Sequence, residues 1–133
     1  MNVNRLTDKA RDALVAAQQE ASQREHTQME PEHLLLALVQ QGDGVAPQIL
    51  QRLGVTPKTV SVQLESALDE LPRAHGPTQV YASRELEAVL DRAEKEATGF
   101  KDEYTSAEHL LLAITDSRTG KAATMAHLIS QSL

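Results

Sequence analysis

Two Glu-His pairs are the parts of this sequence that come closest to a reactive site. Glu32-His33 and Glu108-His109 each precede an apolar run, and an imidazole beside a carboxylate could transfer protons or bind a metal ion. Neither pair has the His-Glu-x-x-His spacing that places two metal ligands on one helix face. A small metal-dependent enzyme built on these histidines is therefore the alternative, and we expect both to pack at helix starts or to lie on the surface. The isolated histidines are predicted to lie on the surface: His26, His75 and His127.

Other catalytic motifs are missing from the sequence. The chain has no cysteine, no Gly-x-Ser-x-Gly elbow and no Ser-His-Asp order that would indicate a nucleophilic enzyme. It also has no Gly-x-x-x-x-Gly-Lys-Ser/Thr loop, which ATP hydrolysis requires for holding the phosphates. We therefore expect a non-catalytic domain with no catalytic residue and no bound metal or cofactor of its own.

Composition indicates one soluble domain that avoids nucleic acids and membranes. The 133 residues are 41% hydrophobic, and 13 basic against 19 acidic side chains give a net charge of −6, which repels a phosphate backbone. Three aromatic residues are too few for the base stacking that single-strand binders use: Tyr81, Phe100 and Tyr104. The start of the chain lacks a signal peptide, and no apolar run approaches the roughly 20 residues of a membrane span. Together with the absence of cysteine, this predicts a cytoplasmic location.

An internal repeat is the most informative feature of the sequence. Shifting the chain by 76 residues aligns EHLLLAL at residues 32–38 with EHLLLAI at residues 108–114. The same shift places Thr7 on Ser83 and gives 12 identities over the 40 positions from residue 7 to 46. The domain is therefore predicted to be a duplicated unit.

Each unit is predicted to form a set of helices. The expected fold is therefore all-α, with two pseudo-symmetric repeats of about four helices each. Thr7 and Ser83 are suitable N-caps, and the apolar residues behind them recur at three- and four-residue spacing. Residues 34–39 and 110–114 are apolar on every side, so these segments are predicted to be the central core helices. Thr105 and Glu108 have the spacing of a capping box at the second of these helices.

Glycine and proline residues divide the rest of the chain. Gly54 is predicted to end a third helix in the left-handed conformation, and Thr56-Pro57 opens a fourth. Pro72 ends that helix, so a single domain over 1–133 divides into repeat one (5–71), a linker (72–82) and repeat two (83–133). Repeat two has a third helix at about 121–131 but no room for the fourth, and we expect that the chain was cut from something longer or that its end was not resolved.

The repeat sequences resemble the N-terminal domains of Clp-type AAA+ unfoldases, and within these the ClpB disaggregases. The motifs that carry the resemblance cover nearly the whole chain: RLT at 5–7, EPEHLLLAL at 30–38, LP at 71–72, DEY at 102–104 and SAEHLLLA at 106–113. ClpC-type domains usually begin both core helices with Gly-Thr-Glu-His, whereas this chain has Glu-Pro-Glu-His and Ser-Ala-Glu-His. The resemblance therefore favours ClpB.

The resemblance implies a domain that receives unfolded or aggregated polypeptide and passes it to a hexameric AAA+ ring. In such a protein, ATP and magnesium bind to AAA+ modules that lie outside this chain, and a DnaK-type chaperone system is the partner. The isolated domain is expected to be a monomer and the full-length protein a homohexamer. The alternative within the family is a ClpC- or ClpA-like N-domain that docks adaptors for a protease. A third possibility is a free-standing repeat protein that acts as a competitor or adaptor.

The resemblance also implies where polypeptide binds. By motif, the substrate-handling residues of ClpB N-domains fall on Thr7, Asp102 and Glu108, although capping alone would also explain Thr7 and Glu108. An apolar groove between the repeats is the second implied site, with Leu90, Val80 and Tyr81 as its candidate residues. ClpB relatives can carry leucine where this chain has charged or polar residues, so we expect weak binding in that groove: Arg92, Glu96 and His109.

Overall fold

The first helix of each repeat begins where the sequence pattern places it. In the computed structural model, which describes residues 3–74 and 79–115, α1 spans Asp8–Gln23 and α5 spans Arg84–Gly99. The Thr7 hydroxyl accepts a hydrogen bond from the Ala10 N–H at 3.2 Å, and Ser83 does the same for Leu86 at 3.1 Å. Both N-caps are therefore confirmed. The buried stripes are made of small and branched apolar residues: Ala10, Ala13, Ala17 and Ala21 on α1, and Leu86, Val89, Ala93 and Ala97 on α5.

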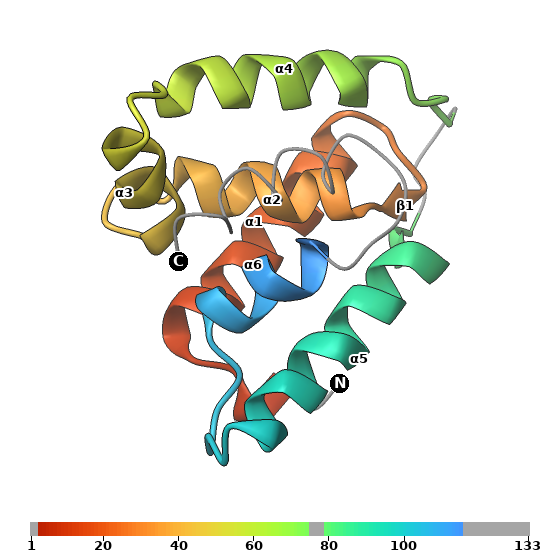
Figure 1. The fold of residues 1–133 in the computed structure, drawn as a ribbon. Helices are drawn as coiled ribbons and strands as arrows, with labels where there is room; N and C mark the ends of the chain where they lie inside the picture. The colour runs from red at the N-terminus through yellow and green to blue at the C-terminus, as the bar shows by residue number, and fades with distance from the viewer. Residues whose placement is uncertain (1–2, 75–78, 116–133) are drawn as a thin grey trace.

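The two all-apolar segments form the centre of the fold. They lie in α2 (Pro31–Gln40) and α6 (Ala107–Thr115), and Leu35 and Leu111 have no exposed surface. Figure 1 shows α2 in the middle of the molecule, between α4 and the pair formed by α1 and α6. Because α2 has neighbours on several sides, it needs the apolar surface all round that its sequence provides.

The third and fourth helices of repeat one also match the sequence. They are α3 (Val45–Arg52) and α4 (Pro57–Asp69), with a short 3-10 helix, η1 (Val3–Arg5), at the start of the chain. Gly54, between α3 and α4, has a φ of +75°, the left-handed conformation predicted from its place after the third helix. The helix predicted at about 121–131 lies outside the described residues. The all-α class is confirmed, and none of the described helices is long and apolar enough to cross a membrane.

Two short parallel pairings, absent from the sequence-based prediction, join the repeats. Strand β1 (Gln28–Met29) pairs with β2 (Tyr81–Ala82), which lies at the end of the predicted linker, and Leu6 forms a similar bridge with Thr105. The 76-residue shift places Leu6 on Ala82 and Met29 on Thr105, so the start of each repeat pairs with the segment before the other repeat's core helix. We call the Leu6–Thr105 region the α6 junction and the Met29–Ala82 region the α2 junction. Pairings of one or two residues leave no alternating pattern that sequence reading could detect.

Candidate functional site

The predicted residues Thr7, Asp102 and Glu108 come together around the α6 junction. The Thr7 N–H donates to the Thr105 carbonyl at 2.9 Å, and the Thr105 N–H donates to the Arg5 carbonyl at 2.7 Å. Thr7 is thereby fixed beside the segment that runs from Asp102 to Glu108. No hydrogen bond or ion pair joins the three side chains within the described residues, so they share a surface without forming a direct polar cluster.

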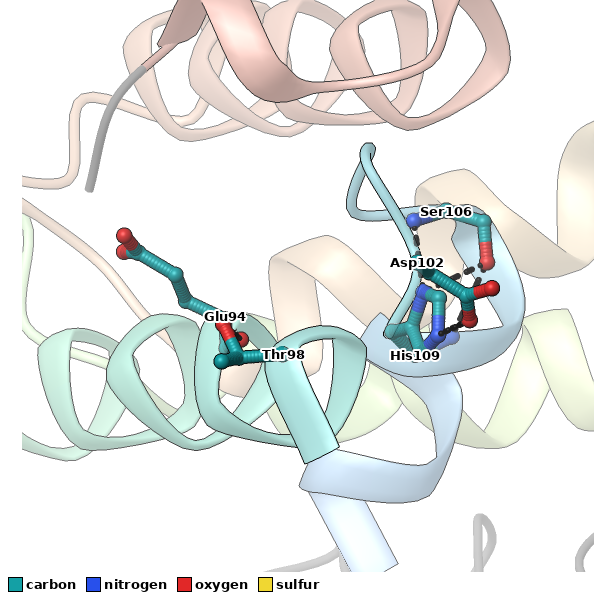
Figure 2. Close-up of polar contacts among 5 residues, drawn as sticks. All are labelled: Glu94, Thr98, Asp102, Ser106 and His109. Carbon is teal, nitrogen blue, oxygen red and sulfur yellow. Dashed lines mark hydrogen bonds and ion pairs between the residues drawn. The ribbon is translucent and has the colours of Figure 1, made fainter. Parts of the chain in front are cut away.

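Asp102 is bonded to the histidine of the second Glu-His pair (Figure 2). His109 Nε2 lies 3.0 Å from Asp102 Oδ2, and the Ser106 N–H donates to His109 Nδ1 at 2.8 Å. Since Nδ1 accepts, we assign the ring proton to Nε2, which donates it to the carboxylate. The His109 side chain is 10% exposed and that of Asp102 is 51% exposed, so the carboxylate remains accessible from outside.

The capping box of α6 lies one residue later than predicted. It consists of Ser106 and His109, because the Ser106 hydroxyl accepts from the His109 N–H at 3.3 Å while the His109 ring accepts from the Ser106 N–H. The predicted pairing of Thr105 with Glu108 is therefore wrong, since a histidine takes the role expected of the glutamate. Glu108 is exposed and makes no hydrogen bond or ion pair within the described part of the chain. Its carboxylate is available to a partner.

The α2 junction contains the same arrangement with a different partner. The Glu30 N–H donates to His33 Nδ1 at 2.8 Å, and His33 Nε2 lies 2.9 Å from Nδ1 of His26. The prediction that His26 lies on the surface is wrong, since it is 3% exposed and His33 is fully buried. Burial lowers the pKa of His33 to about 4, and the neighbouring His26 and Arg24 act in the same direction.

Both histidines of the Glu-His pairs thus pack at helix starts, which is one of the two placements expected from the sequence. Their ring nitrogens are occupied by hydrogen bonds to the backbone and to the side chains of His26 and Asp102. Among the described residues, no group of three or more His, Asp or Glu side chains is arranged to hold a metal ion.

Two exposed aromatic rings distinguish the α6 junction from the α2 junction. Phe100 is 66% exposed and Tyr104 is 49% exposed, whereas the equivalent positions of repeat one carry Arg24 and Gln28. The third aromatic residue, Tyr81, is 62% exposed, so the core contains no aromatic side chain although such residues usually bury large areas. Aromatic rings that the fold does not use for packing are available for binding.

We define the acidic–aromatic surface as Phe100, Asp102, Glu103, Tyr104 and Glu108, all of which are exposed. The Phe100 ring also lies against His109, with 6.5 Å between the ring centroids, which connects it to the bonded Asp102. Sequence reasoning identified Asp102 and Glu108 but missed Phe100 and Tyr104, because it did not consider these two rings for polypeptide binding. Comparison of the two repeats at these positions was the signal that could have found them.

The candidate residues of the apolar groove are less clearly grouped. Leu90 is half-buried and packs against the core, Val80 is half-buried, and Tyr81 is exposed with its hydroxyl 3.0 Å from Gln79. A hollow of about 430 Å³ lies on α5, but its lining is largely charged or polar and does not include Leu90: Arg92, Lys95, Glu96, Gly99 and Phe100. This lining is consistent with the weak apolar groove expected from the sequence. The binding role of these residues stays a prediction.

Comparison with known proteins gives the family. The family described as the Clp repeat (R) N-terminal domain matches residues 5–128. The chain belongs to this family. Chaperone protein ClpB 2 of Nostoc sp. is 43% identical to this Clp N-domain over 122 residues, which are 90% of this chain and 14% of that protein. The prediction of a ClpB-like chaperone N-domain is confirmed, and the chain spans about a seventh of the length of this relative.

Solved structures support the fold of this Clp N-domain. The Hsp104 N-terminal domain from Candida albicans matches with a TM-score of 0.81 at 21% identity, over 94% of this chain and 81% of that one. A complex of the ClpV N-domain with a VipB peptide matches with a TM-score of 0.76 at 18% identity, over 95% and 79% of the two chains. At these identities the likeness concerns the fold alone.

Proposed function

We propose that this ClpB-like N-domain binds segments of unfolded or aggregated polypeptide at its acidic–aromatic surface and passes them to a hexameric AAA+ ring in a longer protein. The observation that supports this proposal best is the exposure of Phe100 and Tyr104 beside the accessible carboxylates of Asp102 and Glu108. The ClpB relative is named a chaperone, and the ClpV N-domain of the same fold is in complex with a peptide. Both facts favour polypeptide as the ligand.

The chemistry of the surface fits an unfolded chain. An aromatic ring that is half or more exposed gains free energy when an apolar side chain covers it, and an unfolded protein exposes such side chains. Carboxylates beside the rings attract lysine and arginine side chains through solvent-exposed interactions that are each weak. Binding through two rings and a few exposed charges is expected to be weak, which allows release toward the ring of ATPase modules.

The rest of the assignment follows the family. We propose that this domain is non-catalytic, that ATP and magnesium act in AAA+ modules outside this chain, and that a DnaK-type chaperone system cooperates with the whole protein. A cytoplasmic location and a monomeric isolated domain belong to the same proposal. Docking of an adaptor for a protease is the competing function, and it would use a folded partner instead of an unfolded chain.

The test removes the two rings and measures binding to an unfolded model protein. Phe100→Ala combined with Tyr104→Ala is expected to weaken binding of labelled casein about tenfold, as measured by fluorescence anisotropy, because about 1.4 kcal/mol of apolar contact is lost. Urea unfolding should show little change in stability, since both rings are exposed.

The comparison variant is Tyr81→Ala, which removes an equally exposed aromatic ring at the end of the linker and tests the second candidate site, the apolar groove, which is expected to bind weakly. We expect this variant to bind casein as the unaltered domain does. Loss of binding in Tyr81→Ala but not in the double variant would move the site to the linker. Unchanged binding in both would contradict the proposed surface and favour the docking of a folded adaptor elsewhere.

A further inference from the structure

The hydrogen bonds around the core-helix histidines, His33 and His109, follow the same pattern in the two junctions, but the partner of Nε2 differs. In each, the first residue of a capping box donates its N–H to a histidine Nδ1 at 2.8 Å, from Glu30 to His33 and from Ser106 to His109. In each, the segment before the capping box begins with a residue of positive φ, Glu25 at 62° and Lys101 at 59°. The next residue is the partner of the histidine Nε2, and it is His26 in repeat one but Asp102 in repeat two.

The hydrogen bonds of the α2 junction leave no nitrogen between the two rings free to accept a proton. His33 Nδ1 is occupied by the Glu30 N–H, so Nε2 of His33 carries the ring proton and donates it to Nδ1 of His26. A proton added to Nδ1 of His33 would point at the Glu30 N–H, and a proton added to Nδ1 of His26 would point at the Nε2–H of His33. Either event breaks a hydrogen bond and leaves a cation among buried groups.

The charged groups around this pair do not offer it a direct anionic partner. The Arg24 guanidinium, at the end of α1, disfavours a proton on either ring, and it is already paired with Glu20 of α1 and Asp69 of α4. Arg73, which follows α4, adds a second positive charge. The Glu30 carboxyl accepts from the backbone N–H of His33 in the capping box and bonds to Ser83 of repeat two, and burial raises its pKa. Burial and the two arginines lower the pKa of His26.

The α6 junction differs in this respect. An imidazolium at His109 would also lose the bond from the Ser106 N–H, but its Nδ1–H could donate to the Ser106 hydroxyl, which lies 2.9 Å away. Its Nε2–H would face the Asp102 carboxylate at 3.0 Å, and that carboxylate is half exposed to water. A proton can therefore be accommodated there as an ion pair.

We propose that the buried His26–His33 pair makes the α2 junction an acid-sensitive contact, which opens when either ring takes a proton while the α6 junction stays closed. The hydrogen bonds that would be released hold β2 and both ends of the linker: Ser83 N–H to Met29, Tyr81 N–H to Thr27 and Ala74 N–H to Glu25. Opening would separate the start of repeat two from repeat one and leave the acidic–aromatic surface in place.

The experiment compares two equivalent amides in the intact chain by hydrogen exchange and NMR. The Ser83 N–H bonds the Met29 carbonyl at 3.0 Å in the α2 junction, and the Thr7 N–H bonds the Thr105 carbonyl at 2.9 Å in the α6 junction. Between pH 7.5 and pH 5, the protection factor of the Ser83 amide should fall about 30-fold, the value given by a histidine pKa of 6.5 when open and about 4 when closed. The protection factor of the Thr7 amide should change less than threefold.

Two variants exchange the partners between the junctions. His26→Asp gives His33 a carboxylate partner, and the fall in Ser83 protection should disappear. Asp102→His gives His109 an imidazole partner, and the Thr7 amide should become acid-sensitive. If His26→Asp does not fold, the Asp102→His variant carries the test, since that position is partly exposed. Equal falls at Ser83 and Thr7 in the unaltered chain, or a persistent fall at Ser83 in His26→Asp, would overturn the proposal.

Discussion

Replacing the two N-cap residues separates structural from binding roles at the predicted site. Thr7→Ala removes the hydroxyl that accepts from the Ala10 N–H, and loss of such a cap costs about 1 kcal/mol of stability. Ser83→Ala removes the equivalent cap for Leu86 and also the hydroxyl that bonds the half-buried Glu30 carboxyl. The second substitution should therefore cost more, about 2 to 3 kcal/mol.

The assay is thermal unfolding at pH 7 for both variants, in parallel with casein binding. We expect Thr7→Ala to lower the melting temperature by about 3 °C and Ser83→Ala by more than twice that amount. Thr7→Ser, which keeps the cap, should restore stability. Casein binding by Thr7→Ala should stay within twofold of the unaltered domain, because the Thr7 hydroxyl is already used within the fold. A large loss of binding with unchanged stability would refute this reasoning and give Thr7 a direct role.

Three further predictions concern pH, the core and an ion-pair group. Folding lowers the pKa of His33 from 6.5 to about 4, so the stability that the neutral ring contributes is complete above about pH 6.5 and is lost as the pH falls toward 4. Urea unfolding at pH 4.5 should therefore show a free energy of unfolding about 2.5 kcal/mol lower than at pH 7. A stability that does not depend on pH would contradict the buried neutral ring. Leu35→Ala and Leu111→Ala should each cost about 2 to 5 kcal/mol, since both side chains are fully buried, and an unchanged melting temperature would contradict the central position of α2 and α6. Arg24→Met should lower the stability measured by thermal unfolding by about 1 kcal/mol, because the ion pairs with Glu20 and with the largely exposed Asp69 are lost. Added salt should abolish the difference in stability between this variant and the unaltered domain, and a difference that persists would refute its electrostatic origin.

The helices could be predicted from the sequence because their signals are local. Thr7 and Ser83 satisfy amides three residues away, Gly54 permits a left-handed turn, and the apolar runs in α2 and α6 require burial on all sides. Each of these features depends on residues within one helix or one turn, so a single sequence with a clear repeat was sufficient.

The junctions could not be predicted because they depend on contacts between distant segments. His26 is isolated in sequence, but the turn after α1 places it against His33, and nothing in the residues between them indicates that contact. The α6 capping box is local but was placed one residue too early, because its last residue is His109, whereas the usual pattern has glutamate or glutamine there. Of the candidate site, Asp102 and Glu108 were found from motifs, whereas the exposure of Phe100 and Tyr104 required the packed core to be known.

The central claim is that polypeptide binds at the acidic–aromatic surface, and an NMR titration of the isolated domain with unfolded casein tests it most directly. We expect the amide shifts to cluster at residues 100–108, with the equivalent residues 24–32 of repeat one as an internal reference that stays unchanged. Shifts confined to residues 24–32, or no shifts at high casein concentration, would contradict the claim that this surface recognises unfolded polypeptide.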